Sequence, residues 1–413
     1  MPFFKLKGYL GKERTMKELK LRYLLLGALM DSIGMSFVWP LTTVYMHNIL
    51  GHSLTIVGIV LMLNSVASII GSFVAGQLFD RYDGYYLLLG GIVFTALSMF
   101  VLVFSNDWPV YPIMLILIGL GTGWIMAFVN ALGTTVHSRD GRFVFNMLYF
   151  VQNMGVMIGT AVVGLMFKDN VAPLFAVSTG LYVLFFAVAA INYHVKRERP
   201  KQKHQMDQNA NVATNTEKLP HVNTVIMYTL FISLFLIWIF YQQWNSNISV
   251  YMLSLHIPLK DYSFLWTVNG LFILIVQGFL SWQGGKFFKD PFHQVYFGML
   301  FLIASFVILV FAKAYWSFVL AMIILTIGEA ITFPQIPAIA NLLSPYGMKG
   351  RYQGLASSFP SAGRALGPLV GSLIIDTLSF VSLFVVASVI IALILFINVA
   401  LIEKSKHELI EYK

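Results

Sequence analysis

The chain of 413 residues contains no cysteine and few charged side chains, and both absences narrow what it can do. Without cysteine it has no disulfide, no thiolate metal site and no cysteine nucleophile. Charged residues make up only 11% of the chain, whereas soluble domains average about 25%. The sequence also lacks a Walker-type phosphate loop, a cluster of metal-ligating side chains and a nucleophile beside a plausible base. We therefore expect neither an enzyme nor an ATP-driven protein, with no metal and no other cofactor.

Long apolar runs dominate what remains, since 58% of the residues are hydrophobic. Twelve runs are long enough to cross a hydrocarbon core of about 30 Å as helices. The predicted spans are 21–46, 54–79, 86–105, 110–136, 143–167, 172–195, 221–255, 262–284, 294–312, 315–343, 352–375 and 380–402. The sequence thus predicts an all-α integral membrane protein.

The distribution of Lys and Arg predicts how the chain crosses the bilayer. With the N-terminus inside, the segments on that side carry 23 of the 27 basic residues. This asymmetry predicts that both termini are cytoplasmic. It also accounts for the net charge of +9, through topology and anionic headgroups, so we expect membrane lipid but no nucleic acid as a partner. Residues 1–20 lack the pattern of a cleaved signal peptide.

A polar, charged segment without periodicity, residues 196–220, divides the chain into two halves of six runs each. We therefore predict a cytoplasmic N-terminal segment at 1–20, six-helix bundles at 21–195 and 221–402, a cytoplasmic linker at 196–220 and a tail at 403–413.

The two halves also repeat one another. Residues 119–159 resemble residues 326–367 at an offset of about 208. Each copy has a glycine-containing span, a loop ending in Gly-Arg, and then a span with Gly-x-x-x-Gly, at Gly155/Gly159 and Gly363/Gly367. Two parallel six-span repeats are typical of transporters whose site lies between the halves near the midplane. The prediction is twelve transmembrane helices in two pseudo-symmetric bundles that work as a monomer.

Three ionisable side chains lie deep inside apolar runs: Asp31, Glu329 and Arg364. A charge at mid-bilayer costs roughly 2.5–3.5 kcal/mol on insertion scales, so such residues usually serve a function. A carboxylate that loses its hydration favours the protonated form, which suits a proton carrier. Glu329 is therefore a candidate for proton coupling and Asp31 a second candidate, for protons or for a cationic substrate. Arg364 is a candidate ion-pair partner of Glu329 or a ligand for an anionic substrate group.

The chain resembles the major facilitator superfamily over its whole length. The resemblance lies in Gly76-Gln-Leu-Phe-Asp80-Arg81, in Asn130-Ala131, in Gln152-Asn153 and in Leu325-Thr-Ile-Gly-Glu329. Within the superfamily it is most similar to the twelve-span drug:proton antiporters of the lactococcal multidrug antiporter type. The resemblance implies a secondary transporter that works by alternating access on a proton gradient, with Glu329 in proton coupling.

The loop after the second span is similar to the superfamily's gating motif, Gly-x-x-x-Asp-Arg-x-Gly-Arg-Lys. Gly76, Asp80, Arg81 and Gly84 match it, and in the family the Asp latches the two halves in one state. Asp83 is an insertion in that pattern, and tyrosines replace the basic pair. The resemblance therefore implies a gating latch here, weakened by these departures.

A polar stretch in span 7, Tyr241–Asn247, is unusual inside lipid and reads either as a cavity lining or as the outer end of a long helix in the headgroup zone. Pro334 and Pro337, just past Glu329, predict a bend at the site. The predicted substrate cavity consists of Asn130, Tyr149, Gln152, Asn153, Tyr241, Gln242, Trp244, Asn245 and Phe333.

The function most consistent with these features is proton-coupled efflux of amphipathic small molecules across a bacterial plasma membrane. Two alternatives stay open from the sequence. One is a proton-coupled importer of a sugar, an organic acid or a peptide, because importers share the architecture. The other is a lipid flippase or a non-transporting membrane sensor, because fold does not fix function.

Overall fold

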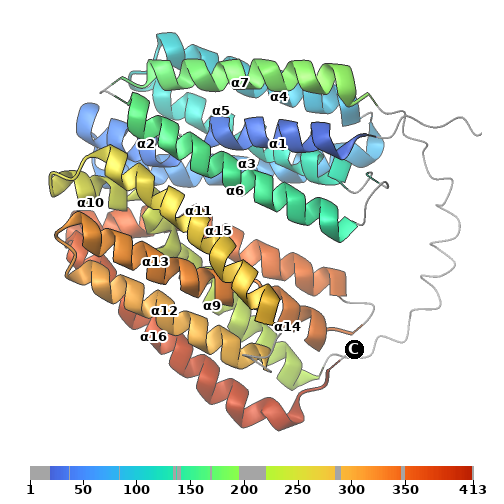
Figure 1. Cartoon of the computed structure of the whole chain (residues 1–413), viewed down its shortest axis with the longest axis vertical. Helices are drawn as coiled ribbons and strands as arrows, with labels where there is room; N and C mark the ends of the chain where they lie inside the picture. The colour runs from blue at the N-terminus through green and yellow to red at the C-terminus, as the bar shows by residue number, and fades with distance from the viewer. Residues whose placement is uncertain are drawn as a thin grey trace, which may run out of the picture.

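A computed structural model describes residues 19–36, 38–82, 84–133, 136, 141–167, 170–194, 220–283, 290–345 and 349–411. Within these ranges the regular structure is entirely helical. The helices run roughly parallel to one another in two groups, and the described chain enters and leaves at one end of the molecule (Figure 1). We refer to that end as the terminal end and to the opposite one as the distal end.

The first half of the chain forms one bundle. Its first crossing is interrupted: α1 ends at a turn, and the chain continues in a short helix and a π-helical turn. The elements are α1 (Leu21–Met35), α2 (Val38–Val44), η1 (Tyr45–Ile49), α3 (Leu54–Arg81), α4 (Gly84–Phe104), α5 (Val110–Gly133), α6 (Gly141–Met166) and α7 (Ala172–Asn192).

The second half forms the other bundle, in which the crossings that begin with α9 and α13 are each built from two consecutive helices. The elements are α9 (His221–Ser246), α10 (Ile248–Ser254), α11 (Leu259–Gln283), α12 (Pro291–Val310), α13 (Tyr315–Thr332), α14 (Gln335–Leu343), α15 (Lys349–Thr377) and α16 (Phe380–Ser405), followed by the turn η2 (Lys406–Glu408). The break between α13 and α14 at Phe333–Pro334 confirms the predicted bend.

Among the described residues, ten of the twelve predicted crossings are apolar and long enough to span a membrane on composition alone. The first and the eleventh differ for separate reasons. The first is divided between α1, α2 and η1, so no single helix reaches the required length. The eleventh, α15, is 29 residues long but carries Ser357, Ser358, Ser361 and Arg364 on successive turns. These polar residues therefore lie on one face of a continuous helix and not in a loop.

The repeated glycine motifs are helix-packing surfaces in both bundles. A Cβ at Gly155 would lie 2.5 Å from Ser32 Cβ, and one at Gly159 would meet Ser36, so α6 packs tightly on α1. A Cβ at Gly363 would lie 2.4 Å from the carbonyl oxygen of Phe235, so α15 packs in the same way on α9. Small residues at this spacing allow close backbone approach between membrane helices. The same motif thus makes the same contact in each repeat.

The bundles meet through α3 with α15 and through α6 with α11, and these contacts are tight near the distal end. A Cβ at Gly58 of α3 would lie 2.8 Å from the Pro368 carbonyl oxygen of α15. One at Gly164 of α6 would lie 2.8 Å from Ser263 Cβ of α11. Beside Gly58, Asp376 Oδ2 of α15 accepts hydrogen bonds from the backbone N–H and the hydroxyl of Thr55, at 2.7 and 2.6 Å.

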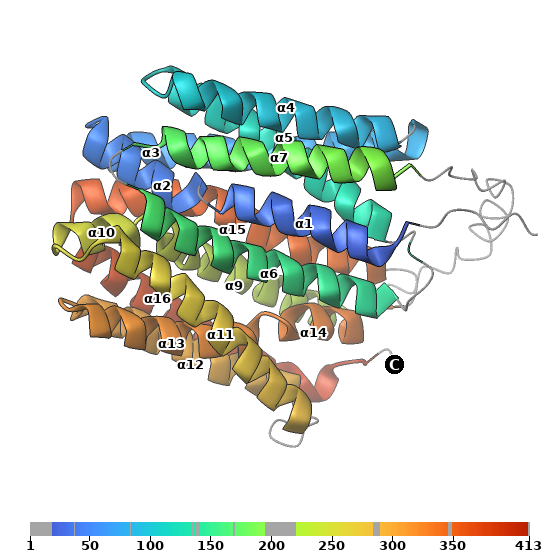
Figure 2. The ribbon, with the colours of Figure 1, turned by 45° about the horizontal axis from the view of Figure 1, so that its top comes forward.

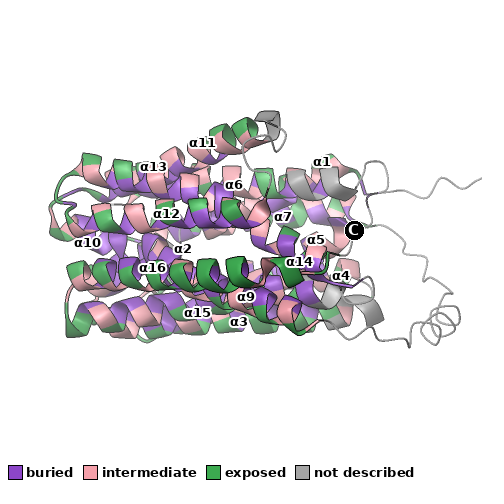
Figure 3. Ribbon diagram, turned by 90° about the horizontal axis from the view of Figure 1, so that it is seen from below, coloured by how far each residue is buried: buried purple, intermediate pink, exposed green. Residues whose placement is uncertain are grey.

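The same helices are open toward the terminal end. A Cβ at Gly76 of α3, Gly278 of α11 or Gly354 of α15 would meet no atom of the described residues within 4 Å. Consistent with this, α11 leans away from the other helices toward that end (Figures 2 and 3). The conformation is therefore closed at the distal end and open at the terminal end.

The last helix extends beyond the predicted span into the predicted tail. α16 continues to Ser405, and Lys406 pairs with Asp290 at the start of α12. Further along, Ile410 exchanges two hydrogen bonds with Asn223, which is fully buried. The side of α16 away from the core is apolar and exposed (Figure 3), as at Phe396, which is 72% exposed. The tail is thus packed onto the terminal end of the second bundle, and the apolar surface suits contact with lipid.

Candidate functional site

Glu329 lies near the middle of the tenth crossing, fourteen residues beyond the start of α13 at its distal end. At 1.5 Å per residue it is about 21 Å from that end. Its carboxylate oxygen Oε2 accepts a hydrogen bond of 2.8 Å from the Tyr241 hydroxyl and one of 3.3 Å from the Asn269 amide. Asn269 is fixed in turn by a 2.8 Å bond to Thr326. Three helices of one bundle, α9, α11 and α13, therefore converge on a single half-buried carboxylate.

Three aromatic rings form a wall beside this carboxylate. Trp238 and Phe333 are stacked, with ring centroids 5.0 Å apart and an interplanar angle of 26°. Tyr241 lies 4.8 Å from Trp238 and 5.6 Å from Phe333, measured between centroids. Trp238 and Tyr241 are one turn apart on α9, whereas Phe333 is at the break after α13. The helix break thus places a third ring against two that share a helix face.

Arg364 of α15 contacts one ring of this wall. Its guanidinium carbon is 4.7 Å from the centroid of the Trp238 ring, which is a cation–π contact. Its Nη2 donates to the Ser361 hydroxyl at 3.2 Å. The side chain is exposed although it lies in the middle of a crossing. A charge at this depth is expected to face the interior of the bundles or a water-filled space rather than hydrocarbon.

The predicted pairing of Arg364 with Glu329 is not formed. In the part of the chain that the structure describes, no ion pair joins the two side chains. Tyr241 and Asn269 donate hydrogen bonds to the carboxylate of Glu329 instead, and the guanidinium of Arg364 makes a cation–π contact with Trp238. The two charged groups contact different rings, because Glu329 is bonded to Tyr241 whereas Arg364 lies over Trp238. They are therefore linked through the Trp238–Tyr241 ring contact and not by an ion pair.

Asp31 is placed in the other bundle. Its Oδ1 accepts a 2.7 Å hydrogen bond from the hydroxyl of Tyr182 on α7, and Tyr182 is fully buried. Asp31 and Glu329 thus share one arrangement, a carboxylate held by a tyrosine hydroxyl from a neighbouring helix. The two acids lie in different bundles and have no hydrogen-bond partner in common.

The polar stretch of span 7 is mostly packing rather than a cavity lining in this conformation. Gln242 and Trp244 are 3% and 0% exposed. Gln243 donates to the Gly367 carbonyl of α15 at 2.7 Å, and Asn247 donates to Gln243 at 2.6 Å. These amides therefore join α9 to α15, because glycines on α15 leave room for them. Asn245 is half-buried within the same stretch, and Tyr241 alone of the predicted span 7 residues contacts Glu329.

The cavity residues predicted in the first bundle are less closely gathered. Tyr149 of α6 is 59% exposed. Asn153 donates to the Tyr149 carbonyl oxygen at 2.8 Å, one turn away on the same helix. Gln152 is half-buried on α6, and Asn130 is half-buried near the terminal end of α5. In the described structure, no hydrogen bond joins any of these residues to Glu329.

The predicted gating motif is only partly described. Gly76 is on α3 with open space beside it, and Gly84 is the first residue of α4. Asp80 and Arg81 end α3, but their side chains lie outside the described residues. The latch expected from the resemblance therefore stays a prediction.

Three residues of the two carboxylate sites were not singled out from the sequence. Asn269 carried a signal, since it is an amide inside a mostly apolar run. Trp238 carried a weaker one, because it precedes Tyr241 by one turn and so shares its helix face. Tyr182 carried none, because a tyrosine within a crossing is ordinarily a packing residue. Its role depends on the contact between α1 and α7.

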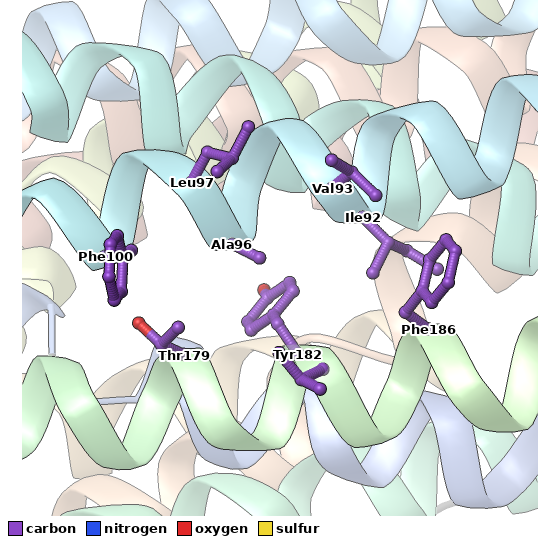
Figure 4. A pocket seen from close by; sticks show the side chains of 9 residues that line it. Ile92, Val93, Ala96, Leu97, Phe100, Thr179, Tyr182 and Phe186 are labelled. Atoms are coloured by element: carbon purple, nitrogen blue, oxygen red, sulfur yellow. The ribbon is translucent and has the colours of Figure 1, made fainter.

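A separate hollow lies on the bilayer-facing side of the first bundle, between α4 and α7 (Figure 4). Its volume is about 380 Å³, and side chains such as Leu97, Phe100 and Val183 line it. Leu97 and Val183 are 59% and 57% exposed. Tyr182 forms part of its lining, but no charged group does. This surface suits hydrocarbon, and the polar site near Glu329 remains the functional candidate.

The family model of the Major Facilitator Superfamily matches residues 24–359 and 293–411. The chain belongs to this superfamily of membrane transporters, and its two bundles have the superfamily's fold. An uncharacterised MFS-type transporter of Bacillus subtilis, YttB, is 37% identical over 361 residues, which cover 86% of this chain and 88% of YttB. The quinolone resistance protein NorA of Staphylococcus aureus is 24% identical over 356 residues, covering 83% of this chain and 87% of NorA.

Solved structures are similar in fold at low sequence identity. A mutant of the peptide transporter POT has a TM-score of 0.78 at 15% identity, covering 94% of this chain and 95% of that one. A mutant of the nucleoside transporter NupG has a TM-score of 0.70 at 13% identity, covering 93% of this chain and 100% of that one. These likenesses support the twelve-helix architecture and carry no information on the substrate.

Proposed function

We propose that the protein is a proton-coupled exporter of amphipathic small molecules. The observation that carries this proposal is Glu329, a mid-membrane carboxylate held by a tyrosine and an amide, without a cationic partner among the described residues. A carboxylate with neutral partners can gain and lose a proton without breaking an ion pair. The adjacent wall of Trp238, Tyr241 and Phe333 offers apolar, polarisable surface to a substrate.

The arrangement of the helix ends supports a proposal of alternating access. If the terminal end is cytoplasmic, as the basic residues predict, this conformation faces inward. A substrate would then enter from the cytoplasm and lie against the aromatic wall. Proton binding at Glu329 and substrate binding beside it would bias the two bundles toward opposite states, since a ligand shifts a conformational equilibrium only by its differential affinity.

Asp31 is proposed as a second acid that carries protons or meets a cationic substrate. It is the corresponding mid-membrane carboxylate of the first bundle, and it too has a tyrosine partner. We further propose that the protein acts as a monomer in a bacterial plasma membrane. The proton gradient would then be the energy source, and no cofactor would be required.

The similarity to NorA, whose name associates it with quinolone resistance, supports export of aromatic compounds. The similarity to YttB supports membrane transport without indicating a substrate. An importer of a sugar, an organic acid or a peptide would share the fold, so the direction of transport is decided by experiment. The aromatic wall beside a carboxylate favours amphipathic substrates over sugars.

The test is transport in proteoliposomes with an imposed pH gradient, using an aromatic cationic dye. The wild type should show a component driven by the gradient. Glu329→Gln should lose that component while downhill exchange of the dye persists, because the amide cannot exchange a proton. Asp261→Asn is the matched control, since Asp261 lies at the distal start of α11. An unchanged response to the gradient in Glu329→Gln would remove this residue from the coupling mechanism.

A further inference from the structure

The positive charge of Arg364 is not balanced by a negatively charged neighbour in the described structure. Ser361 accepts one hydrogen bond from the guanidinium, and the Trp238 ring lies beneath it. Among the described residues no carboxylate lies within ion-pairing distance of it. A guanidinium has five N–H donors, so most of them have no acceptor from the described protein. For a charge at mid-membrane depth this arrangement is costly, and it indicates a partner that is not part of the chain.

The two carboxylates nearest to mid-membrane depth have other partners. Glu329 is bonded to Tyr241 and Asn269, and Asp31 is bonded to Tyr182 in the other bundle. A purely structural arginine would be expected to pair with one of them. The stacking on Trp238 instead orients the planar guanidinium in advance, so less side-chain entropy is lost when a ligand binds.

The chemistry of the group identifies its ligand. The guanidinium fork matches a carboxylate in shape and can bind it through two parallel hydrogen bonds. Trp238 extends from beneath the guanidinium to Phe333 and Tyr241, and Tyr241 contacts Glu329. A molecule in contact with these rings would therefore lie near both a fixed positive charge and a carboxylate.

We propose that Arg364 recognises a carboxylate on an aromatic substrate, so that the site prefers aromatic acids and zwitterions over the corresponding neutral or cationic esters. This inference rests on the proposed function, because it assigns the substrate class of the same site. Trp238, Tyr241 and Phe333 bind the ring system, and Glu329 receives the basic group where the substrate has one.

The test compares a rhodamine that has a free carboxylic acid with the methyl ester of the same dye. Binding to the purified protein is measured by ligand-induced thermal stabilisation, and transport is measured in proteoliposomes. The wild type should bind the acid more tightly than the ester. Arg364→Gln should weaken binding of the acid by about tenfold or more while changing binding of the ester by less than about twofold. Arg364→Lys keeps the charge without the fork and should give an intermediate loss.

The chain offers a matched control in Arg22, near the terminal end of α1. Its guanidinium also stacks on an aromatic ring, that of Tyr23, at the same 4.7 Å. Arg22→Gln should therefore leave the preference for the acid unchanged. It reports what loss of a stacked arginine does to the protein away from the proposed site.

The outcomes separate this inference from the proposed function. Equal binding of acid and ester by the wild type overturns the inference, as does binding of neither dye. An Arg364→Gln variant that weakens both dyes equally also overturns it and makes Arg364 a packing residue. Selective binding of the acid without any gradient-driven transport contradicts the proposed function and leaves the recognition by Arg364 intact.

Discussion

Tyr241 donates a hydrogen bond of 2.8 Å to the carboxylate of Glu329, and this contact joins α9 to α13 in the middle of the second bundle. Tyr182 makes the equivalent contact with Asp31 in the first bundle, at 2.7 Å. A tyrosine hydroxyl can donate to a carboxylate and can accept from a carboxylic acid. Each tyrosine can therefore keep a hydrogen bond to its acid in both protonation states. An arginine or lysine cannot, because its side chain has no acceptor.

Tyr241→Phe should accordingly impair coupling more than folding. The ring and its contacts with Trp238 and Phe333 are kept, and only the hydroxyl that holds Glu329 is lost. We expect gradient-driven transport to fall several-fold while the melting temperature changes little. Tyr251→Phe is the control, because its hydroxyl donates to the Ala312 carbonyl oxygen at 3.1 Å, near the distal end. If both variants lose transport equally, the Tyr241 hydroxyl has no special role in coupling.

The glycine motif of α15 leads to a stability prediction. A Cβ at Gly363 would lie 2.4 Å from a backbone carbonyl oxygen, which cannot rotate away. Gly363→Ala should therefore separate α15 from α9 and cost about 1–3 kcal/mol, as overpacking does. Gly354→Ala on the same helix meets no atom within 4 Å and should be neutral or slightly stabilising, because alanine favours helix. Melting temperatures in detergent test this, and equal effects of the two changes would contradict it.

The predicted topology can be tested directly because the chain has no cysteine of its own. Single cysteines at Asn211, in the predicted linker, and at Asp107, in a distal loop, should react with an impermeant maleimide from opposite sides of the membrane. The reason is the excess of Lys and Arg on the side of the linker. Labelling of both positions from the same side would refute the assignment of both termini to the cytoplasm.

The sequence was sufficient for the architecture but not for the partners of the three mid-span charges. Hydropathy and the internal repeat depend on short segments, so they predict the two helical bundles correctly. The partners of Arg364 depend on how α15 is rotated against α9. Gly363 and Gly367 set that rotation by letting α9 approach, which places the guanidinium on Trp238 and not beside Glu329. Likewise, Gln242 looked like a cavity residue because nothing local revealed that α15 packs against it, and Trp244 because nothing local revealed that it is fully buried.

The tail contact at the terminal end predicts a pH-dependent stability. Partial burial alone would raise the pKa of Asp290, but hydrogen bonds from Lys406, the Phe292 backbone and His293 hold this pKa below its ordinary value of 3.8. A depressed carboxylate pKa stabilises the folded state above the ordinary value, and the contribution is lost as the pH falls through the lower one. Asp290→Asn should therefore lower the melting temperature at neutral pH, and the difference from wild type should vanish in acid.

That effect should be small, because Lys406 is 36% exposed and exposed ion pairs contribute little. Glu408→Gln serves as the control, since Glu408 is 57% exposed and lies in the same tail. A destabilisation by Asp290→Asn that stays constant down to acid pH would show that the charge of Asp290 is not its cause.

The contact between Thr55 and Asp376 leads to a prediction about the conformational equilibrium. It joins the two bundles at the distal end through two hydrogen bonds to one carboxylate oxygen, and no distal opening is compatible with it. Asp376→Ala removes both bonds, so the closed distal end loses stability relative to an open one. Thr55→Val removes only the hydroxyl bond and should have a smaller effect. The readout is a single cysteine at Gly76, where a Cβ would meet no atom of the described residues within 4 Å. Its rate of labelling should fall several-fold when Asp376→Ala is added, because closure of the terminal end accompanies opening of the distal end.

A cysteine at Ser105, in the distal loop between α4 and α5, should label at an unchanged rate and controls for reagent access. If labelling at Gly76 stays the same in the Asp376→Ala background, the contact does not hold the distal end closed.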